Sequence, residues 1–157
     1  MLYQTHVRVH LNNIRSNIEN IRKTIGPDRK ILIAVKADGY GHGAIEVSKM
    51  AEKIGVDWLG VATVPEAIEL RHAGINLPIL KFSPAFPEEM TEAVNHHMAL
   101  AVCETNNALL LNEAARSCNR VTEVHIKLET GMGRIGVAID QAKELAGRII
   151  KDCPFLR

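Results

Sequence analysis

The sequence is poor in cysteine and in long apolar segments, and each shortage excludes a class of protein. Its 157 residues include three cysteines, and no pair of them has the Cys-x-x-Cys spacing. An odd number of cysteines without that spacing argues against a disulfide framework and against a zinc site, so we expect reduced thiols. No apolar run approaches the roughly 18 residues that a membrane-spanning helix needs, so we expect no membrane partner.

The charges of the chain are nearly balanced. Lys and Arg total 19 and Asp and Glu total 18, which leaves a formal net charge of +1. Such a small net charge gives no electrostatic footprint for nucleic acid. The N-terminal segment Met1–His6 has no basic stretch followed by an apolar one, so it does not resemble a secretory signal. We therefore expect a globular, cytoplasmic protein.

What the sequence does contain is a repeating unit of a short apolar run, a break, and a helical pattern. Apolar runs of this kind are typical of parallel strands that are buried on both faces. Between them, apolar residues recur with the three- and four-residue spacing of a helix, as in the stripe of isoleucines from Ile14 to Ile25. The predicted strands are Ile31–Val35, Trp58–Ala62, Pro78–Phe82, Ala99–Cys103 and Val124–Leu128.

Residues with known preferences at helix ends mark the boundaries of the predicted helices. Gly26 ends the first helix. Thr63, followed by Glu66 three residues later, predicts a capping box at the start of another. Thr105 and Asp140 are the predicted N-caps of the last two helices.

Consecutive βα units of this length build either a doubly wound open sheet or a (β/α)8 barrel, and the pattern alone does not choose between them. Five complete strands are visible, and Pro154–Arg157 has the composition of the beginning of a sixth. A full barrel typically takes about 250 residues. If the fold is a barrel, we expect an incomplete one with five to six βα units.

The segment Thr5–Leu11 has a different pattern from the later strands. Basic and apolar residues alternate there in the order His6, Val7, Arg8, Val9, His10 and Leu11. A period of two predicts a half-exposed strand. We assign residues 1–12 to a strand that pairs with something outside the barrel, and residues 13–157 to the barrel.

A lysine, Lys36, stands at the carboxyl end of the first predicted strand. In α/β sheets and barrels that end of the strands faces the active site. Apolar surroundings disfavour the ammonium form of a lysine, and the neutral amine can form a Schiff base with an aldehyde. Tyr40 follows in a glycine-rich turn, from which its hydroxyl can reach a phosphate. The alternative is that Lys36 marks where the strand meets water, as most lysines do.

A second polar cluster follows the fifth predicted strand. His125, Lys127 and Glu129 project from one face of that strand. After two glycines, Arg134 offers a planar guanidinium to a carboxylate or phenolate oxygen. The alternative is a solvated loop, or an ordinary ion pair of Lys127 or Arg134 with Glu129. Near His42, His72, His96 and His97 we identify no carboxylate or cysteine at ligand spacing, so we expect no metal site.

Both segments resemble signatures of the alanine racemase family. Val35–Gly43 resembles the cofactor-lysine segment of that family, and Val124–Val137 resembles a second signature. The similarity extends over essentially the whole chain, including Thr5–Ile25 and Val61–Ala67. It implies an α/β fold, a (β/α)8 TIM-type barrel followed by a mostly β C-terminal domain. By this resemblance we expect the entry strand of residues 1–12 to belong with the C-terminal β domain, and residues 13–157 to be the N-terminal part of the barrel, up to the sixth strand. This resemblance, rather than the periodicity, favours the barrel over the open sheet.

The resemblance also implies the roles of four residues. Lys36 corresponds to the lysine that binds pyridoxal 5'-phosphate as a Schiff base and acts as one of two catalytic bases. Tyr40 corresponds to a tyrosine that holds the cofactor phosphate. Arg134 corresponds to an arginine that contacts the cofactor ring oxygen and the carboxylate of the substrate. Lys127 corresponds to a lysine that is carbamylated in many members and then orients the arginine.

By the same resemblance, we expect an isomerase that interconverts L- and D-alanine, supplies D-alanine for the peptidoglycan of the cell wall, and acts as a homodimer. The second catalytic base of the family is a tyrosine on the C-terminal domain of the partner subunit. We therefore expect negligible racemase activity from residues 1–157 alone. Two alternatives remain open, a racemase for serine or another amino acid and a non-catalytic half-barrel that binds pyridoxal phosphate.

Overall fold

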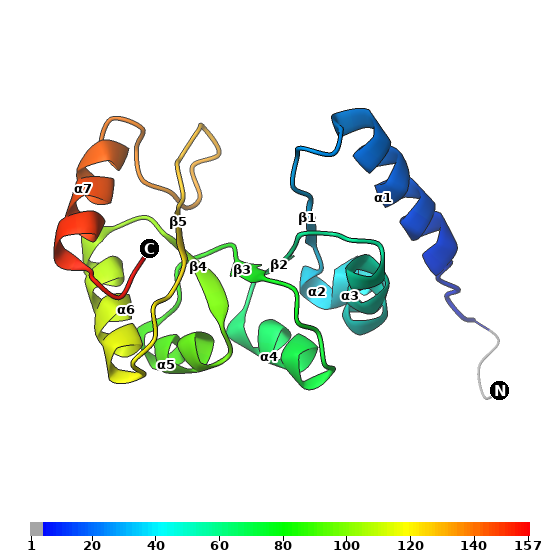
Figure 1. Ribbon diagram of the computed structural model, residues 1–157, viewed down its shortest axis with the longest axis horizontal. Helices are drawn as coiled ribbons and strands as arrows, with labels where there is room; N and C mark the ends of the chain where they lie inside the picture. The colour runs from blue at the N-terminus through cyan, green and yellow to red at the C-terminus, as the bar shows by residue number, and fades with distance from the viewer. Residues whose placement is uncertain (1–4) are drawn as a thin grey trace.

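The structure, a computed structural model, describes residues 5–157 (Figure 1). Five strands in this part of the chain form one parallel sheet, in the same order as in the sequence. They are β1 (Leu32–Ala34), β2 (Trp58–Val61), β3 (Ile79–Lys81), β4 (Met98–Val102) and β5 (Val124–Ile126). The helices are α1 (Leu11–Ile25), α2 (Lys36–Gly41), α3 (Ala44–Lys53), α4 (Val64–His72), α5 (Pro87–Asn95), α6 (Thr105–Ser117) and α7 (Ala142–Asp152).

Each of the five predicted apolar runs forms a strand, with ends that agree within two residues. Neighbouring strands run parallel, with Gly60 opposite Leu80 and Ala101 opposite His125. Every connection between neighbouring strands contains at least one helix. The prediction of consecutive βα units is therefore confirmed.

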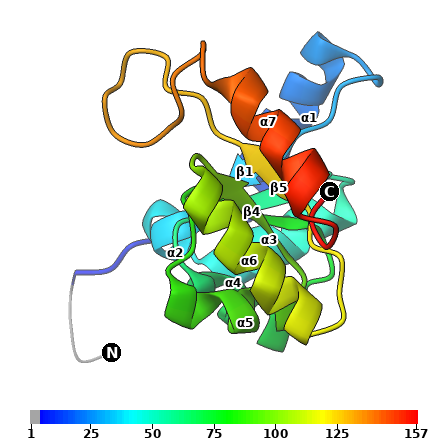
Figure 2. The same ribbon diagram turned by 90° about the vertical axis from the view of Figure 1, so that its left-hand side faces the viewer.

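The sheet is curved, with its helices on the outside. Figure 1 shows the helices in an arc along one side of the strands, and Figure 2 shows α6 between α5 and α7 outside β4. On the opposite face, the rings of Trp58 from β2 and His125 from β5 pack edge to face, with centroids 5.5 Å apart. These two strands are three positions apart, which in a flat sheet would separate them by roughly 14 Å. The contact therefore requires curvature like that of a barrel wall.

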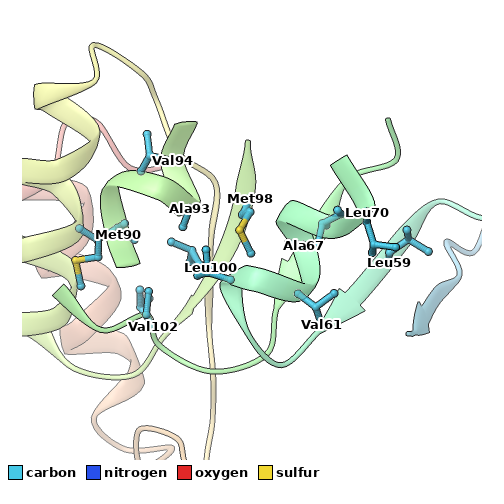
Figure 3. Packing of buried hydrophobic residues seen from close by; sticks show 14 of the residues in the cluster. Leu59, Val61, Ala67, Leu70, Met90, Ala93, Val94, Met98, Leu100 and Val102 are labelled. Carbon is cyan, nitrogen blue, oxygen red and sulfur yellow. The ribbon is translucent and has the colours of Figure 1, made fainter. Parts of the chain in front are cut away.

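The hydrophobic core lies between the sheet and this layer of helices (Figure 3). The side chains of β2, β3 and β4 on the helix side are buried, and apolar ones among them meet apolar side chains from α4 and α5. Ala67 and Ala93 are also fully buried, and their small size allows these two helices to approach the sheet closely. The labelled core residues of the strands are Leu59, Val61, Met98, Leu100 and Val102, and those of the helices include Leu70, Met90 and Val94.

The helix boundaries agree with the sequence prediction except at two caps. Thr63 and Glu66 form the predicted capping box of α4. The N-cap of α6 is Glu104, because the chain leaves β4 fully extended through this residue and turns helical at Thr105. Asp140 is not the N-cap of α7, because it lies inside a turn that closes from Gln141 N to Ala138 O, and Gln141 takes the cap position.

The predicted strand Thr5–Leu11 does not form within the described part of the chain. Residues 5–10 have no regular secondary structure, and α1 begins at Leu11, so the predicted strand is wrong at its last residues. Leu11 is helical because it begins the apolar face of α1, which packs against the core. Pairing of residues 5–10 with a strand outside the barrel stays a prediction, and residues 1–4 lie outside the described part.

The last residues lie where a sixth barrel strand is expected. Leu156 forms a parallel bridge with Thr122 beside β5, and Val124 N donates a hydrogen bond to Arg157 O at 2.9 Å. The serial strand order also excludes a doubly wound sheet, in which the order reverses at a switch point. The fold is thus α/β, with the architecture of an incomplete (β/α)8 barrel. No helix among residues 5–157 is long and apolar enough to cross a membrane.

Candidate functional site

The four residues singled out in the sequence line one pocket at the carboxyl ends of the strands. Lys36 and Tyr40 follow β1, whereas Lys127 and Arg134 follow β5. The pocket has a volume of about 380 Å³. Its lining residues are Lys36, Tyr40, Ala62, Phe82, Ser83, Lys127, Arg134 and Ile135. Two segments that are far apart in the sequence therefore converge, as the ends of parallel strands in a barrel do.

The turn after Lys36, labelled α2, is left-handed. Ala37, Asp38, Gly39 and Tyr40 all have φ between 50° and 61° and ψ between 37° and 52°. This conformation is unfavourable for a residue with a Cβ atom, by roughly 1–2 kcal/mol each, and only Gly39 is free of that penalty. The sequence predicted a tight glycine-rich turn here but not its hand. Backbone strain of this kind persists only where neighbouring contacts stabilise it, and it concentrates at functional sites.

Hydrogen bonds fix this turn to the elements before and after it. Gly39 N donates to Val35 O at 2.8 Å, and the carboxylate of Asp38 accepts a hydrogen bond from Ala44 N, the first residue of α3, at 2.8 Å. The left-handed path brings Tyr40 back beside Lys36, whose Nζ lies 5.6 Å from the centroid of the Tyr40 ring. The amine and the phenol therefore share one wall of the pocket.

Phe82 forms an apolar part of the pocket wall, and its ring packs on Gly60. The ring of Phe82 lies directly over Gly60, so a Cβ atom at Gly60 would come within 1.9 Å of Phe82 Cζ. Glycine is required at this strand position because the ring occupies the space of a side chain. The packing fixes the position of an aromatic surface against which a flat ligand can lie.

The carboxylate of Glu129 organises the loop that carries Arg134. It accepts hydrogen bonds from Gly131 N at 2.7 Å and Arg134 N at 3.1 Å. The backbone N–H groups of Gly133, Gly131 and Arg134 lower the pKa of Glu129. Among residues 5–157, Glu129 pairs with these amides rather than with the side chain of Lys127 or Arg134, so the ion-pair interpretation of this cluster is wrong.

Two further residues support the pocket without having been predicted to do so. Glu66 caps α4 as expected, but its carboxylate also accepts a hydrogen bond from Ala37 N at 2.7 Å. Lys81 ends β3 but points to the helix side, where it is 3% exposed and donates to Pro84 O at 2.8 Å and to Ser83 Oγ at 3.0 Å. For Glu66, the capping box was the only sequence signal. For the buried side chain of Lys81, the sequence contained no signal.

Comparisons with known proteins agree with the barrel fold of this chain. The alanine racemase N-terminal domain family matches residues 9–157. The chain belongs to this family. It is 45% identical to the alanine racemase of Cutibacterium acnes over 142 residues, which are 90% of this chain and 38% of that protein. It is 43% identical to alanine racemase 1 of Caldanaerobacter subterraneus over 132 residues, which are 84% of this chain and 34% of that protein.

The same family appears among solved structures. The alanine racemase of Clostridium difficile 630 in complex with cycloserine superposes with a TM-score of 0.91 and 36% identity, covering 99% of this chain and 43% of that one. The alanine racemase of Bacillus anthracis with bound L-Ala-P superposes with a TM-score of 0.83 and 33% identity, covering 95% of this chain and 38% of that one. The chain thus spans less than half the length of the alanine racemases that it matches.

Proposed function

We propose that this chain is the cofactor-binding part of a pyridoxal-phosphate-dependent alanine racemase. The observation that carries the proposal is the convergence of Lys36, Tyr40, Lys127 and Arg134 on one pocket at the carboxyl ends of the strands. Two separate segments with the family's residue pattern supply these side chains. In this proposal residues 13–157 belong to the barrel, and the whole protein is a cytoplasmic homodimer that supplies D-alanine for the cell wall.

The residues of the pocket have the chemistry that pyridoxal phosphate needs. Lys36 supplies an amine for the aldehyde, and Tyr40 supplies a hydroxyl for the phosphate. Arg134 supplies a cation for the ring oxygen, and the Phe82 ring supplies an apolar surface for the pyridine. The volume of about 380 Å³ is within the range of small-molecule sites.

The reaction divides the work between the cofactor and the protein. When bound, pyridoxal phosphate supplies an electron sink for the negative charge that develops on the α-carbon of the amino acid. Lys36 Nζ removes or returns the α-proton on one face of that carbon. The guanidinium of Arg134 binds the carboxylate of the substrate and fixes its orientation.

Racemisation needs a second base on the opposite face of the α-carbon. By the family resemblance, that base is a tyrosine from the C-terminal domain of the partner subunit. The chain spans 38% of the Cutibacterium acnes relative. We therefore propose that residues 1–157 alone have negligible racemase activity. Assays of the whole protein with alanine, serine and other amino acids test which substrate it prefers.

Lys127 is the proposed carbamylated lysine. Carbon dioxide adds to its neutral amine with loss of a proton, and the product replaces a cation by an anion. An anion in the same pocket as Arg134 attracts the guanidinium, whereas an unmodified ammonium repels it. The modification thus orients Arg134 toward the ligand.

The proposal is tested by binding the cofactor to the purified chain. Pyridoxal phosphate is added, the visible absorption band is recorded, and borohydride is used to fix the adduct for peptide mapping by mass spectrometry. We expect the adduct on Lys36, its loss in Lys36→Ala, and no change in Lys53→Ala, which removes an exposed lysine. An unchanged band in Lys36→Ala would contradict the assignment.

A further inference from the structure

Glu66 connects two βα units at the pocket. It lies in α4 and is partly buried. One carboxylate oxygen accepts hydrogen bonds from Ala62 N at 2.7 Å and Thr63 N at 3.0 Å, within its own unit. The other oxygen accepts a hydrogen bond from Ala37 N at 2.7 Å, across to the previous unit.

The amide of Ala37 belongs to the residue that directly follows Lys36, and it begins the left-handed turn. Ala37 itself has φ 50° and ψ 52°, which an alanine avoids unless its surroundings impose it. The other side-chain hydrogen bonds at the turn stay within the same unit: His42 Nδ1 bonds to the carbonyls of Gly39 and Tyr40, and the Asp38 carboxylate accepts from Ala44 N. Among residues 5–157, Glu66 is thus the single side chain from another unit that hydrogen-bonds to the turn.

The charge of Glu66 suits this role. Burial acts to raise its pKa, but the hydrogen bonds from Ala37, Ala62 and Thr63 outweigh burial, so the pKa lies below the ordinary value. Glu66 is therefore ionised at neutral pH. An ionised carboxylate only accepts hydrogen bonds, and it can serve all three N–H groups at once.

We propose that Glu66 is a positioning residue for Lys36: its carboxylate holds the Ala37 amide, and this contact fixes the start of the left-handed turn that aims the Lys36 side chain into the pocket. The role rests on the proposed function of Lys36 as the cofactor lysine. It differs from helix capping, because the Ala37 contact is not part of the capping box.

Glu66→Gln separates the two roles. The glutamine amide has one oxygen and one NH₂ group, so it can accept from the α4 side or from Ala37, but not from both. Thr63→Ala weakens the capping box without touching Ala37, and it is the matched control for loss of the helix cap. Glu69→Gln makes the same change of charge at an exposed position of the same helix, and it controls for net charge.

The readouts are nuclear magnetic resonance signals of the chain without cofactor. In the wild type we expect the Ala37 amide to exchange slowly, and its chemical shift to titrate with a pKa below 4.5. We also expect an upfield shift of the Lys36 ε-methylene protons, caused by the nearby Tyr40 ring. In Glu66→Gln, the Ala37 amide should exchange roughly tenfold faster or more, as for the loss of a hydrogen bond to a charged acceptor. The Ala37 titration and the Lys36 ring-current shift should disappear.

Both controls should keep the Ala37 titration and the ring-current shift of Lys36. The inference is overturned if Glu66→Gln retains these two signals, or if Thr63→Ala loses them to the same extent. Because no cofactor is present, the result does not depend on whether Lys36 binds pyridoxal phosphate. Failure of the borohydride mapping at Lys36 would contradict the proposed function, and failure of the resonance test would contradict only the positioning role.

Discussion

The carboxylate of Glu129 accepts a hydrogen bond from the backbone amide of Arg134 at 3.1 Å. The same carboxylate accepts a hydrogen bond from Gly131 N at 2.7 Å, so a single side chain spans the sharp turn between β5 and Arg134. The direction in which Arg134 enters the pocket therefore depends on the ionised form of Glu129.

We expect the loop of Arg134 to lose its order at acidic pH. The hydrogen bonds lower the pKa of Glu129 below its ordinary value of 4.5, so their contribution to stability is complete above that value and is lost as the pH falls through the lowered pKa. The amide signals of Gly131 and Arg134 should report this transition. Glu129→Gln should remove the titration, whereas Glu144→Gln, an exposed substitution on α7, should leave it in place. A titration that persists in Glu129→Gln would assign the effect to another group.

Gly60→Ala should destabilise the protein and displace Phe82. The new Cβ atom would lie 1.9 Å from Phe82 Cζ, so the ring must move away from Gly60. We expect a loss of about 1–3 kcal/mol in the free energy of unfolding, measured in urea, as for other overpacked sites.

Two variants serve as controls for this clash. A Phe82→Ala background removes the three atoms nearest to the added methyl group, so Gly60→Ala should cost less there than in the wild type. Gly147→Ala in α7 has no atom within 4 Å of the new Cβ, and it should stabilise the helix by about 0.5–1 kcal/mol. Equal losses for Gly60→Ala in both backgrounds would show that Phe82 is not the cause.

Lys81→Met should destabilise the segment that follows β3. The substitution keeps an apolar stem but leaves the carbonyls of Ser83 and Pro84 without the ammonium group. We expect a loss of about 1–3 kcal/mol at neutral pH, measured by urea unfolding. Lys53→Met, at an exposed position of α3, should change stability by no more than about 0.5 kcal/mol.

The same variant has a predicted pH dependence. Burial lowers the pKa of Lys81, so the folded protein releases this proton at a lower pH than the unfolded chain does. The unfolded state therefore binds more protons between the two pKa values, and the stability of the wild type relative to Lys81→Met should rise as the pH increases toward 10.5. A difference that is constant across this alkaline range would contradict the burial of the amine.

Much of the fold could be predicted because it depends on local pattern. The apolar runs became strands, since a strand that is buried on both faces needs apolar residues at successive positions. Glycine, proline and capping residues marked helix ends, although Thr105 and Asp140 were misplaced as caps. Such residues are tolerated at several positions near a helix start, and the exit geometry of the preceding strand or turn decides which one becomes the cap.

The composition of the candidate site could also be anticipated, because its residues lie in two short segments with characteristic spacing. Lys36 and Tyr40 are close in sequence, and Lys127 and Arg134 are close in the other segment. That the two segments share a pocket followed from the expectation of a barrel. Their roles as cofactor-binding and catalytic groups remain proposals that the labelling experiment tests.

By itself, the sequence determined the order of the βα units, the positions of most helix ends, and the two segments from which the site is built. Only the tertiary structure decided the left-handed path after Lys36, the contact of Glu66 with Ala37, and the burial of Lys81 on the helix side. The reason is physical: periodicity and propensity report what a residue prefers within its own element. Strained backbone and buried charge are instead stabilised by partners from other parts of the chain, which only the folded arrangement brings into contact.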